Sequence, residues 1–263
     1  MESVYHIPAM LQETLEGLKI QPDGTYVDVT FGGGGHSRGI MAHLDKNGRL
    51  FSFDQDLDAW ENEKKGEATL REDKRWQFVH SNFRYLRNFM DYYGVNEIDG
   101  LIADLGVSFH HFDEAERGFS FRFAGPLDMR MNRQGGKNAA DIVNQYDEEE
   151  LARVLYIYGE LKTSRQLARK IVAARSKAAI LRTEQLAEII GEDKKILTLV
   201  FQALRIEVND ELGALREMLM SAKECLEKFG NHYQIAAQIE SGGLCRVAPG
   251  LYSDGTRHHE VEI

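Results

Sequence analysis

Three groups of residues in this sequence could hold a polar cofactor, and each ends a segment with the composition of a buried strand. A run of four glycines, Gly32–Gly35, is followed by His36. Asp54 ends the second of these segments and Asp104 ends the fourth. Glycines let the backbone approach a ligand closely. An acid some twenty residues after such a loop is typical of a group that binds the ribose hydroxyls of an adenosine cofactor. The pattern therefore predicts a site for an adenosine-containing cofactor.

Each of these residues also has a plain structural interpretation. The glycines could form an ordinary turn, and Asp54 and Asp104 could be helix N-caps. A nicotinamide dinucleotide needs its pyrophosphate at a helix N-terminus, usually with G-x-G-x-x-G spacing. The run Gly32–Gly35 followed by His36 fits that spacing only loosely, which favours a cofactor without phosphate. The three groups alone leave both S-adenosylmethionine and a nicotinamide dinucleotide open.

The elements that position these residues alternate along the first half of the chain. β-branched and aromatic residues predict strands over residues 25–31, 49–53, 76–80 and 98–105. Helical patterns precede and separate them, over residues 7–19, from about 37 to 44, up to about 73, and over 84–93. Strands that alternate with helices predict an α/β fold with a doubly wound parallel sheet, in which ligands bind beyond the carboxyl ends of the strands.

This alternation stops near residue 113. Residues 109–136 are rich in aromatic residues, arginine and glycine and read as an ordered loop, and residues 139–191 read as successive helices. A long amphipathic helix is predicted over residues 201–228. We therefore expect a discontinuous cofactor-binding domain, made of residues 1–112 and 201–263, with a helical insertion over residues 113–200.

Composition excludes several classes of protein. No stretch of the 263 residues approaches the roughly 20 apolar residues of a membrane helix, and no signal peptide is visible. Two cysteines are too few for a disulfide framework or a zinc site, so no metal site is expected and a cytoplasmic location fits. A net charge of −10 argues against a general nucleic-acid coat protein. The run 161–182 has seven cations and no acid, and either a local basic face or a solvated helix with acidic partners elsewhere explains it.

Several longer motifs point to one family. They are YVDVTFGGGGHS (26–37), FDQD (53–56), DGLIADLGVS (99–108), AERGFSF (115–121), GPLDMRM (125–131) and FQALRIEVNDEL (201–212). With these motifs the chain closely resembles the bacterial 16S ribosomal RNA cytosine-N4 methyltransferases, from about Tyr5 to Glu227. The resemblance implies a Rossmann-like methyltransferase sheet with a helical substrate domain, S-adenosylmethionine as cofactor, and 16S ribosomal RNA or the small ribosomal subunit as partner. It leaves the oligomeric state open, with a homodimer among the alternatives.

The resemblance also implies which residues contact the cofactor. Carried over position by position, they are Gly34, Gly35, His36, Asp54, Phe83 and Asp104. The family commonly has a glutamine at one further position, where this chain has His111.

The chemistry of methyl transfer suggests further roles as hypotheses. The N4 amine of cytosine is a poor nucleophile, and Asp104, or a backbone carbonyl just after it, could accept a hydrogen bond from N4–H. Phe119 and Phe121 could stack on a base that is splayed out of its helix, although core packing is the commoner role of such residues. Arg117 and Arg130 could hold phosphates, and pairing with Asp128 or Glu116 is an equal alternative.

The end of the sequence departs from the family pattern. After Leu226 the usual Pro-Gly-Gly turn, the following buried strand and a Ser-Phe-His-Ser-like run are not recognisable. A frameshifted tail or a genuine divergence would explain this, and we favour the frameshift, which would leave one edge of the sheet uncovered. Three hypotheses follow, in this order: an active ribosomal RNA methyltransferase, an inactive remnant that binds only cofactor or RNA, and a nicotinamide-dependent oxidoreductase.

Overall fold

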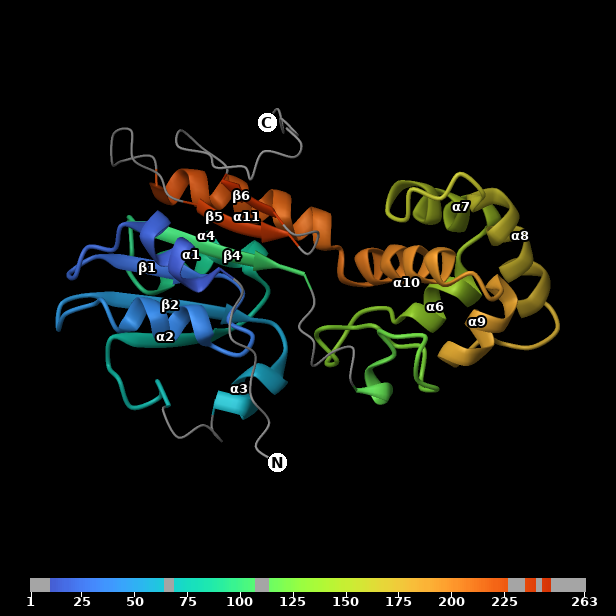
Figure 1. Cartoon of the computed structure of the whole chain (residues 1–263), viewed down its shortest axis with the longest axis horizontal. Coiled ribbons are helices and arrows are strands. Elements are labelled where there is room, and N and C mark those ends of the chain that lie inside the picture. The colour runs from blue at the N-terminus through green and yellow to red at the C-terminus, as the bar shows by residue number, and fades with distance from the viewer. Residues whose placement is uncertain (1–9, 64–68, 107–113, 227–234, 240–242, 247–263) are drawn as a thin grey trace. The chain divides into compact units, whose positions relative to one another are not determined.

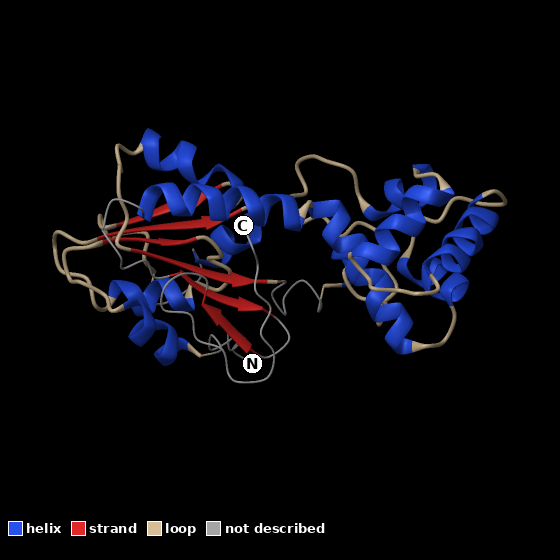
Figure 2. Ribbon diagram, turned by 90° about the horizontal axis from the view of Figure 1, so that it is seen from above, coloured by secondary structure: helices blue, strands red, loops and turns tan. Residues whose placement is uncertain are grey.

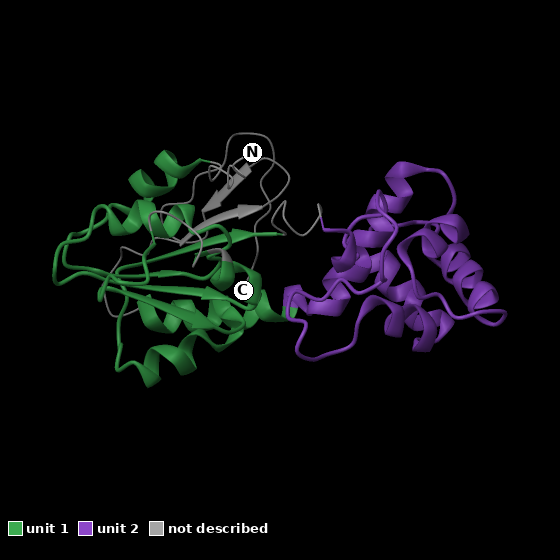
Figure 3. Ribbon diagram, turned by 90° about the horizontal axis from the view of Figure 1, so that it is seen from below, with its two compact units in different colours: residues 1–106, 213–263 green, residues 107–212 purple. Residues whose placement is uncertain are grey.

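The structure is a computed structural model, which describes the chain in five stretches. These are residues 10–63, 69–106, 114–226, 235–239 and 243–246. The chain divides into two compact units (Figure 3), one formed by residues 1–106 and 213–263 and the other by residues 107–212.

The first unit is built on a mixed sheet. Its strands are β1 (Thr25–Asp28), β2 (Arg49–Asp54), β3 (Trp76–His80), β4 (Gly100–Leu105), β5 (Ile235–Ile239) and β6 (Gly243–Arg246). They lie in the order β3-β2-β1-β4-β5-β6 (Figure 1). The pairs from β3 to β5 are parallel, and β6 runs antiparallel to β5. The α/β fold with a parallel sheet that the sequence predicts is confirmed.

Helices cover both faces of this sheet (Figure 2), as the apolar composition of its central strands requires. Successive side chains of a strand point to opposite faces. Val27 of β1 accordingly packs in one core with Met218, whereas the neighbouring Tyr26 packs in the other core with Leu18. The covering elements are α1 (Leu11–Leu18), α2 (Gly35–Met41), α3 (Leu57–Glu63), η1 (Phe83–Tyr85), α4 (Leu86–Tyr92) and α11 (Glu211–Leu226).

Two expectations about the later part of the chain are wrong. The helix predicted over residues 201–228 is two helices, α10 (Lys194–Asn209) and α11, because the intervening Asp210 adopts a left-handed conformation with φ 46°. We also expected no strand after this helix. Instead β5 adds to the sheet in parallel beside β4, with Ala103 opposite Ala237. The edge of β4 is therefore paired.

The second unit is helical. It contains α6 (Ala139–Gln145), α7 (Glu148–Ile157), α8 (Ser164–Arg175), α9 (Thr183–Ile190) and α10, preceded by the short helix η2 (Ala115–Arg117). Its core includes Phe201 and Leu204, so α10 packs with the helices before it rather than with the sheet. None of the helices in the described stretches combines the length and the apolar character needed to span a membrane.

Candidate active site

The carboxyl ends of the central strands place three of the predicted groups at one edge of the sheet. β1 lies between β2 and β4. The loop that follows β1 is tied to both neighbours, because the Phe31 N–H donates to the Phe53 carbonyl at 2.9 Å and the Val29 N–H donates to the Ile102 carbonyl at 3.0 Å. Asp54 ends β2 on one side of this loop, and Asp104 lies near the end of β4 on the other.

The glycine loop has a conformation that depends on glycine. Gly34, which precedes the first residue of α2, has φ 75°, a value that other residues rarely adopt. A Cβ atom on Gly34 would lie 2.7 Å from both the Phe31 ring and the Arg38 guanidinium. Arg38 also donates to the Gly33 carbonyl at 2.7 Å and pairs with the buried carboxylate of Glu63. The loop is thus held from within the fold, and only glycine fits at Gly34, where the Phe31 and Arg38 side chains pack against the backbone.

Asp54 is held in a fixed orientation by backbone donors. One carboxylate oxygen accepts from the Gly32 N–H at 2.9 Å and the other accepts from the Asp56 N–H at 2.8 Å. Asp54 is not the N-cap of the next helix, because α3 begins at Leu57 and the residue before it, Asp56, accepts from the Asp58 N–H at 3.0 Å. The bonds from the Gly32 and Asp56 N–H groups fix the orientation of the Asp54 carboxylate at the edge of the sheet where the glycine loop lies.

Asp104 and His36 face each other at the other side of the loop. The Asp104 N–H donates to Thr30 Oγ1 at 2.7 Å, which fixes the backbone at this point. The Asp104 side chain is 38% exposed, and its Oδ2 lies 4.0 Å from Nδ1 of the buried His36. This distance is too long for a hydrogen bond. Asp104 therefore has an anchored backbone and a partly exposed carboxylate at the edge of the sheet.

A chain of buried polar groups, which the sequence analysis did not single out, supports the loop from below. The Asp28 carboxylate accepts from Ser37 Oγ at 2.6 Å and from the Thr30 N–H at 3.0 Å. Ser37 Oγ lies 2.8 Å from Ser52 Oγ, which also accepts from Trp76 Nε1 at 2.9 Å. The available signal was a buried polar residue beside the apolar residues of each strand, Asp28 in β1 and Ser52 in β2.

Burial raises the pKa of Asp28 to about 6, although the hydrogen bonds from Ser37 and Thr30 lower it. A carboxyl whose pKa is higher in the folded than in the unfolded chain stabilises the fold below pH 3.8, and this stabilisation is lost as the pH rises through 6. Asp28→Asn cannot titrate at this position. We therefore expect its free energy of unfolding, minus that of the wild type, to be higher at pH 7.5 than at pH 4 by roughly 2–4 kcal/mol. Denaturant unfolding of both proteins at the two pH values measures this difference. Parallel pH profiles would contradict it.

Of the two remaining predicted cofactor residues, Phe83 lies farther from the glycine loop than Asp54 and Asp104 do, and His111 lies outside the described stretches. Phe83 begins η1 just after β3 and is half-buried against the core on one face of the sheet. It thus lies at the same edge as the glycine loop, two strands away from β1. His111 lies outside the described residues.

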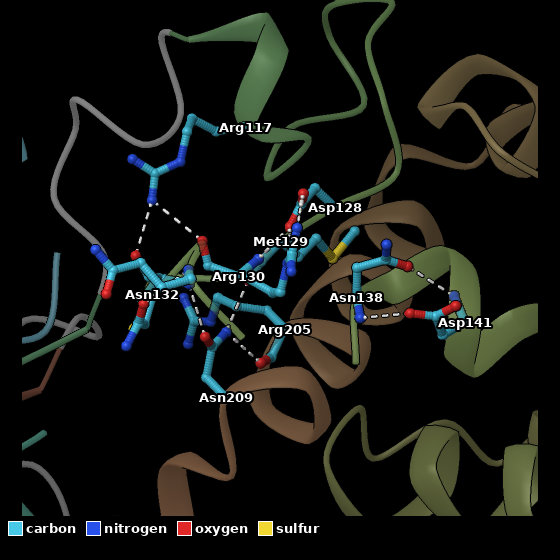
Figure 4. Close-up of polar contacts among 11 residues, drawn as sticks. Arg117, Asp128, Met129, Arg130, Asn132, Asn138, Asp141, Arg205 and Asn209 are labelled. Carbon is cyan, nitrogen blue, oxygen red and sulfur yellow. Dashed lines mark hydrogen bonds and ion pairs between the residues drawn. The ribbon is translucent and has the colours of Figure 1, made fainter. Parts of the chain in front are cut away.

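The structure of the second unit bears on the alternatives for its aromatic and arginine residues. Phe119 is buried in the helical core, and Phe121 packs edge-on against Phe201 with ring centroids 5.6 Å apart. Both therefore have a core-packing role. Arg117 is 1% exposed and donates to backbone carbonyls (Figure 4), so it does not hold a phosphate. Arg130 does pair with Asp128.

The basic run 161–182 becomes α8 and the segments that flank it. Several of its cations have partners elsewhere, since Arg169 pairs with Glu148 and Arg175 donates to the Val143 carbonyl at 2.7 Å. Lys162, Arg165 and Lys177 are exposed. Part of this run therefore has partners elsewhere in the fold, and part of it forms an exposed basic surface.

Comparison with known proteins agrees with this geometry. The sequence model of the MraW methylase family matches residues 3–237. A protein of Porphyromonas gingivalis described as "Ribosomal RNA small subunit methyltransferase H" is 57% identical over 87% of this chain and 74% of its own length. Proteins with the same description from Parabacteroides distasonis and Phocaeicola vulgatus are 58% and 54% identical, each over 87% of this chain and 75% of their own. The chain therefore belongs to the MraW methylase family.

Proposed function

We propose that this protein transfers a methyl group from S-adenosylmethionine to the N4 amine of a cytidine in 16S ribosomal RNA. The observation that carries the proposal is the meeting of the glycine loop, Asp54 and Asp104 at one sheet edge, in a chain whose relatives are described as small-subunit ribosomal RNA methyltransferases. Such a substrate also implies a cytoplasmic reaction. The family excludes the nicotinamide-dependent oxidoreductase as an interpretation.

The residues present fit this cofactor. The glycine loop brings backbone without side chains to the carboxyl end of β1, and Asp54 beside it has a carboxylate whose orientation is fixed by the Gly32 and Asp56 N–H groups. A carboxylate held in this way suits the hydroxyls of a ribose. Gly35, His36 and Phe83 complete the set that we assign to the cofactor, with His111 as the further contact that the family pattern implies. The cofactor supplies an activated methyl group on a sulfonium.

The work left to the protein is alignment and hydrogen bonding. The anchored, partly exposed carboxylate of Asp104 can accept a hydrogen bond from cytosine N4–H. Such a bond orients the amine and stabilises the positive charge that develops on it. A strong general base is unnecessary, because the methylated amine loses its proton readily. The target base must be splayed out of its stack before it can reach this edge.

Binding of S-adenosylmethionine by calorimetry is the first test. We expect Asp54→Ala to raise the Kd by at least roughly tenfold, since hydrogen bonds to a charged group contribute about 1.5–3 kcal/mol each. Asp54→Asn keeps an acceptor for the Gly32 N–H and should keep the loop in place while still weakening binding.

Asp45→Ala is the matched control for this experiment. Asp45 likewise accepts one local backbone N–H, that of Asn47 at 2.7 Å, but it lies in the turn before β2 and not after it. The Kd of Asp45→Ala for S-adenosylmethionine should equal that of the wild type. A wild-type protein that is folded yet binds no S-adenosylmethionine, or fails to methylate small-subunit RNA, would refute the proposed function.

A further inference from the structure

One backbone turn in the helical unit, residues 129–131, is held by side chains from two distant parts of the chain (Figure 4). At its centre Met129 is fully buried and has φ 64°. Arg117 Nη2 donates to the carbonyls of Arg130 and Met131 at 3.1 and 3.2 Å. Asn209 donates to the Met129 carbonyl and accepts from the Met131 N–H, both at 2.8 Å. The backbone on both sides of Met129 is therefore fixed.

The conformation of Met129 is unfavourable for a residue with a Cβ. A strained residue persists only where its surroundings over-determine it, and such residues cluster at functional sites. The side chain next to it, Arg130, is the part of this turn that reaches the surface, with 22% of its side chain exposed. The turn thus gives Arg130 a defined position.

Arg130 is also fixed in orientation. Its Nε and Nη2 each lie 2.8 Å from a different oxygen of the Asp128 carboxylate. This arrangement uses one edge of the guanidinium and directs the Nη1 edge away from Asp128. Within the described part of the chain, the side-chain hydrogen bonds of Arg130 come from Nε and Nη2, and Nη1 donates none.

A second Asp-x-Arg pair in the same chain shows what a purely structural version looks like. Arg75 binds Asp73 through the same two atoms, Nε and Nη2. Its Nη1, however, donates to the backbone carbonyls of Leu44 and Asp45 at 2.5 and 3.3 Å. In Arg75 the Nη1 edge of the guanidinium donates to carbonyls of the protein itself. In Arg130 the same edge can donate to a ligand.

The surroundings of Arg130 suit an anion. Burial raises the pKa of Asp128, but the hydrogen bonds from Arg130 and the charge of Arg133 outweigh this effect and lower it, so the pair stays ionised. The exposed run 132–137 that follows carries Arg133 and Lys137. Asp141, which caps α6 together with Asn138, opposes these charges. A planar fork with two outward N–H groups matches two oxygens of a phosphate.

We propose that Arg130 binds a backbone phosphate of the RNA substrate through its Nη1 edge, with Asp128 as the residue that positions it. The inference rests on the proposed function for the identity of the anion. A phosphate contact would set the register of the RNA on the helical unit without reading its sequence.

The test is the salt dependence of RNA binding by the full chain, with a fragment of small-subunit ribosomal RNA as the probe. Loss of one phosphate contact should weaken binding at every salt concentration and reduce the slope of log K against log salt by about 0.7–0.9. We expect this from Arg130→Gln, with an unchanged Kd for S-adenosylmethionine. Arg75→Gln removes the same charge from the other Asp-x-Arg pair and should leave the slope unchanged.

Two more variants separate the contact from a merely structural role. Arg130→Lys keeps the charge but not the fork, so it should keep the salt slope and bind more weakly; it also provides the test if Arg130→Gln does not fold. Asp128→Asn should raise the KM for RNA several-fold with little change in kcat. A folded Arg130→Gln protein with the wild-type affinity for RNA and the wild-type salt slope would overturn the phosphate contact of Arg130 but not the proposed function. Wild-type protein that binds no RNA would overturn the proposed function as well.

Discussion

Asp104→Ala is expected to lower the kcat for methylation of small-subunit RNA by roughly one to two orders of magnitude. The Asp104 carboxylate is the partly exposed acceptor that β4 presents beside the glycine loop. A hydrogen bond to a charged group contributes about 1.5–3 kcal/mol, and each 1.4 kcal/mol of transition-state stabilisation changes the rate tenfold. Single-turnover kinetics with saturating cofactor measures the chemical step directly. Asp104→Asn, which retains an acceptor oxygen without the charge, should fall between the alanine variant and the wild type.

Asp99→Ala is the matched control for Asp104. Asp99 immediately precedes the same strand, at its amino end, where its carboxylate accepts from the Thr25 N–H at 2.7 Å. This variant loses an acidic side chain and a hydrogen bond in the same unit, yet it should keep the wild-type kcat. Equal losses in the Asp99 and Asp104 variants would point to a general effect on stability and would contradict the role of Asp104.

The parallel sheet could be predicted because its signals are local. β1, β3 and β4 lie within predicted strands, and β2 extends one residue beyond its predicted strand, to Asp54. In the central strands the apolar side chains are consecutive, because these strands are buried on both faces. The meeting of the glycine loop with Asp54 and Asp104 follows from the same argument, since parallel strands end at one edge. The chemical roles of these residues, in contrast, came from the resemblance to a family, and they remain proposals.

Other features are not revealed by the spacing of apolar residues, because they depend on the backbone conformation of one residue or on contacts between distant residues. The break between α10 and α11 rests on a left-handed Asp210 in a continuous amphipathic pattern. β5 is short, and its place in the sheet follows from its pairing with β4. The buried polar chain needs Asp28 and Ser52 to meet across two strands through Ser37. Arg117 looked like a phosphate ligand because cations are usually exposed, whereas backbone carbonyls satisfy it in the interior.

Gly118→Ala is expected to destabilise the helical unit by more than about 4 kcal/mol, a size reserved for a few severe mechanisms. Gly118 has φ 71°, and a Cβ there would lie 2.1 Å from the Pro126 carbonyl oxygen and 2.8 Å from the Asp128 nitrogen. Because these are backbone atoms, no rotation of a side chain relieves the overlap. The adjacent bond from the Met129 N–H to the Arg117 carbonyl, 3.0 Å long, would have to break. Amide hydrogen exchange in α6 to α10 measures the loss.

Gly136→Ala isolates the cost of backbone conformation from the cost of overlap. Gly136 lies in the same unit and has φ 80°, but a Cβ there would meet no atom within 4 Å. Its alanine variant should therefore show only the penalty of a left-handed conformation, about 1–2 kcal/mol. If both variants lost similar stability, the close packing of residues 115–118 against residues 126–129 would not hold. A much larger loss in Gly118→Ala would show that this packing carries the turn from which Arg130 is presented, and RNA affinity should then fall with it.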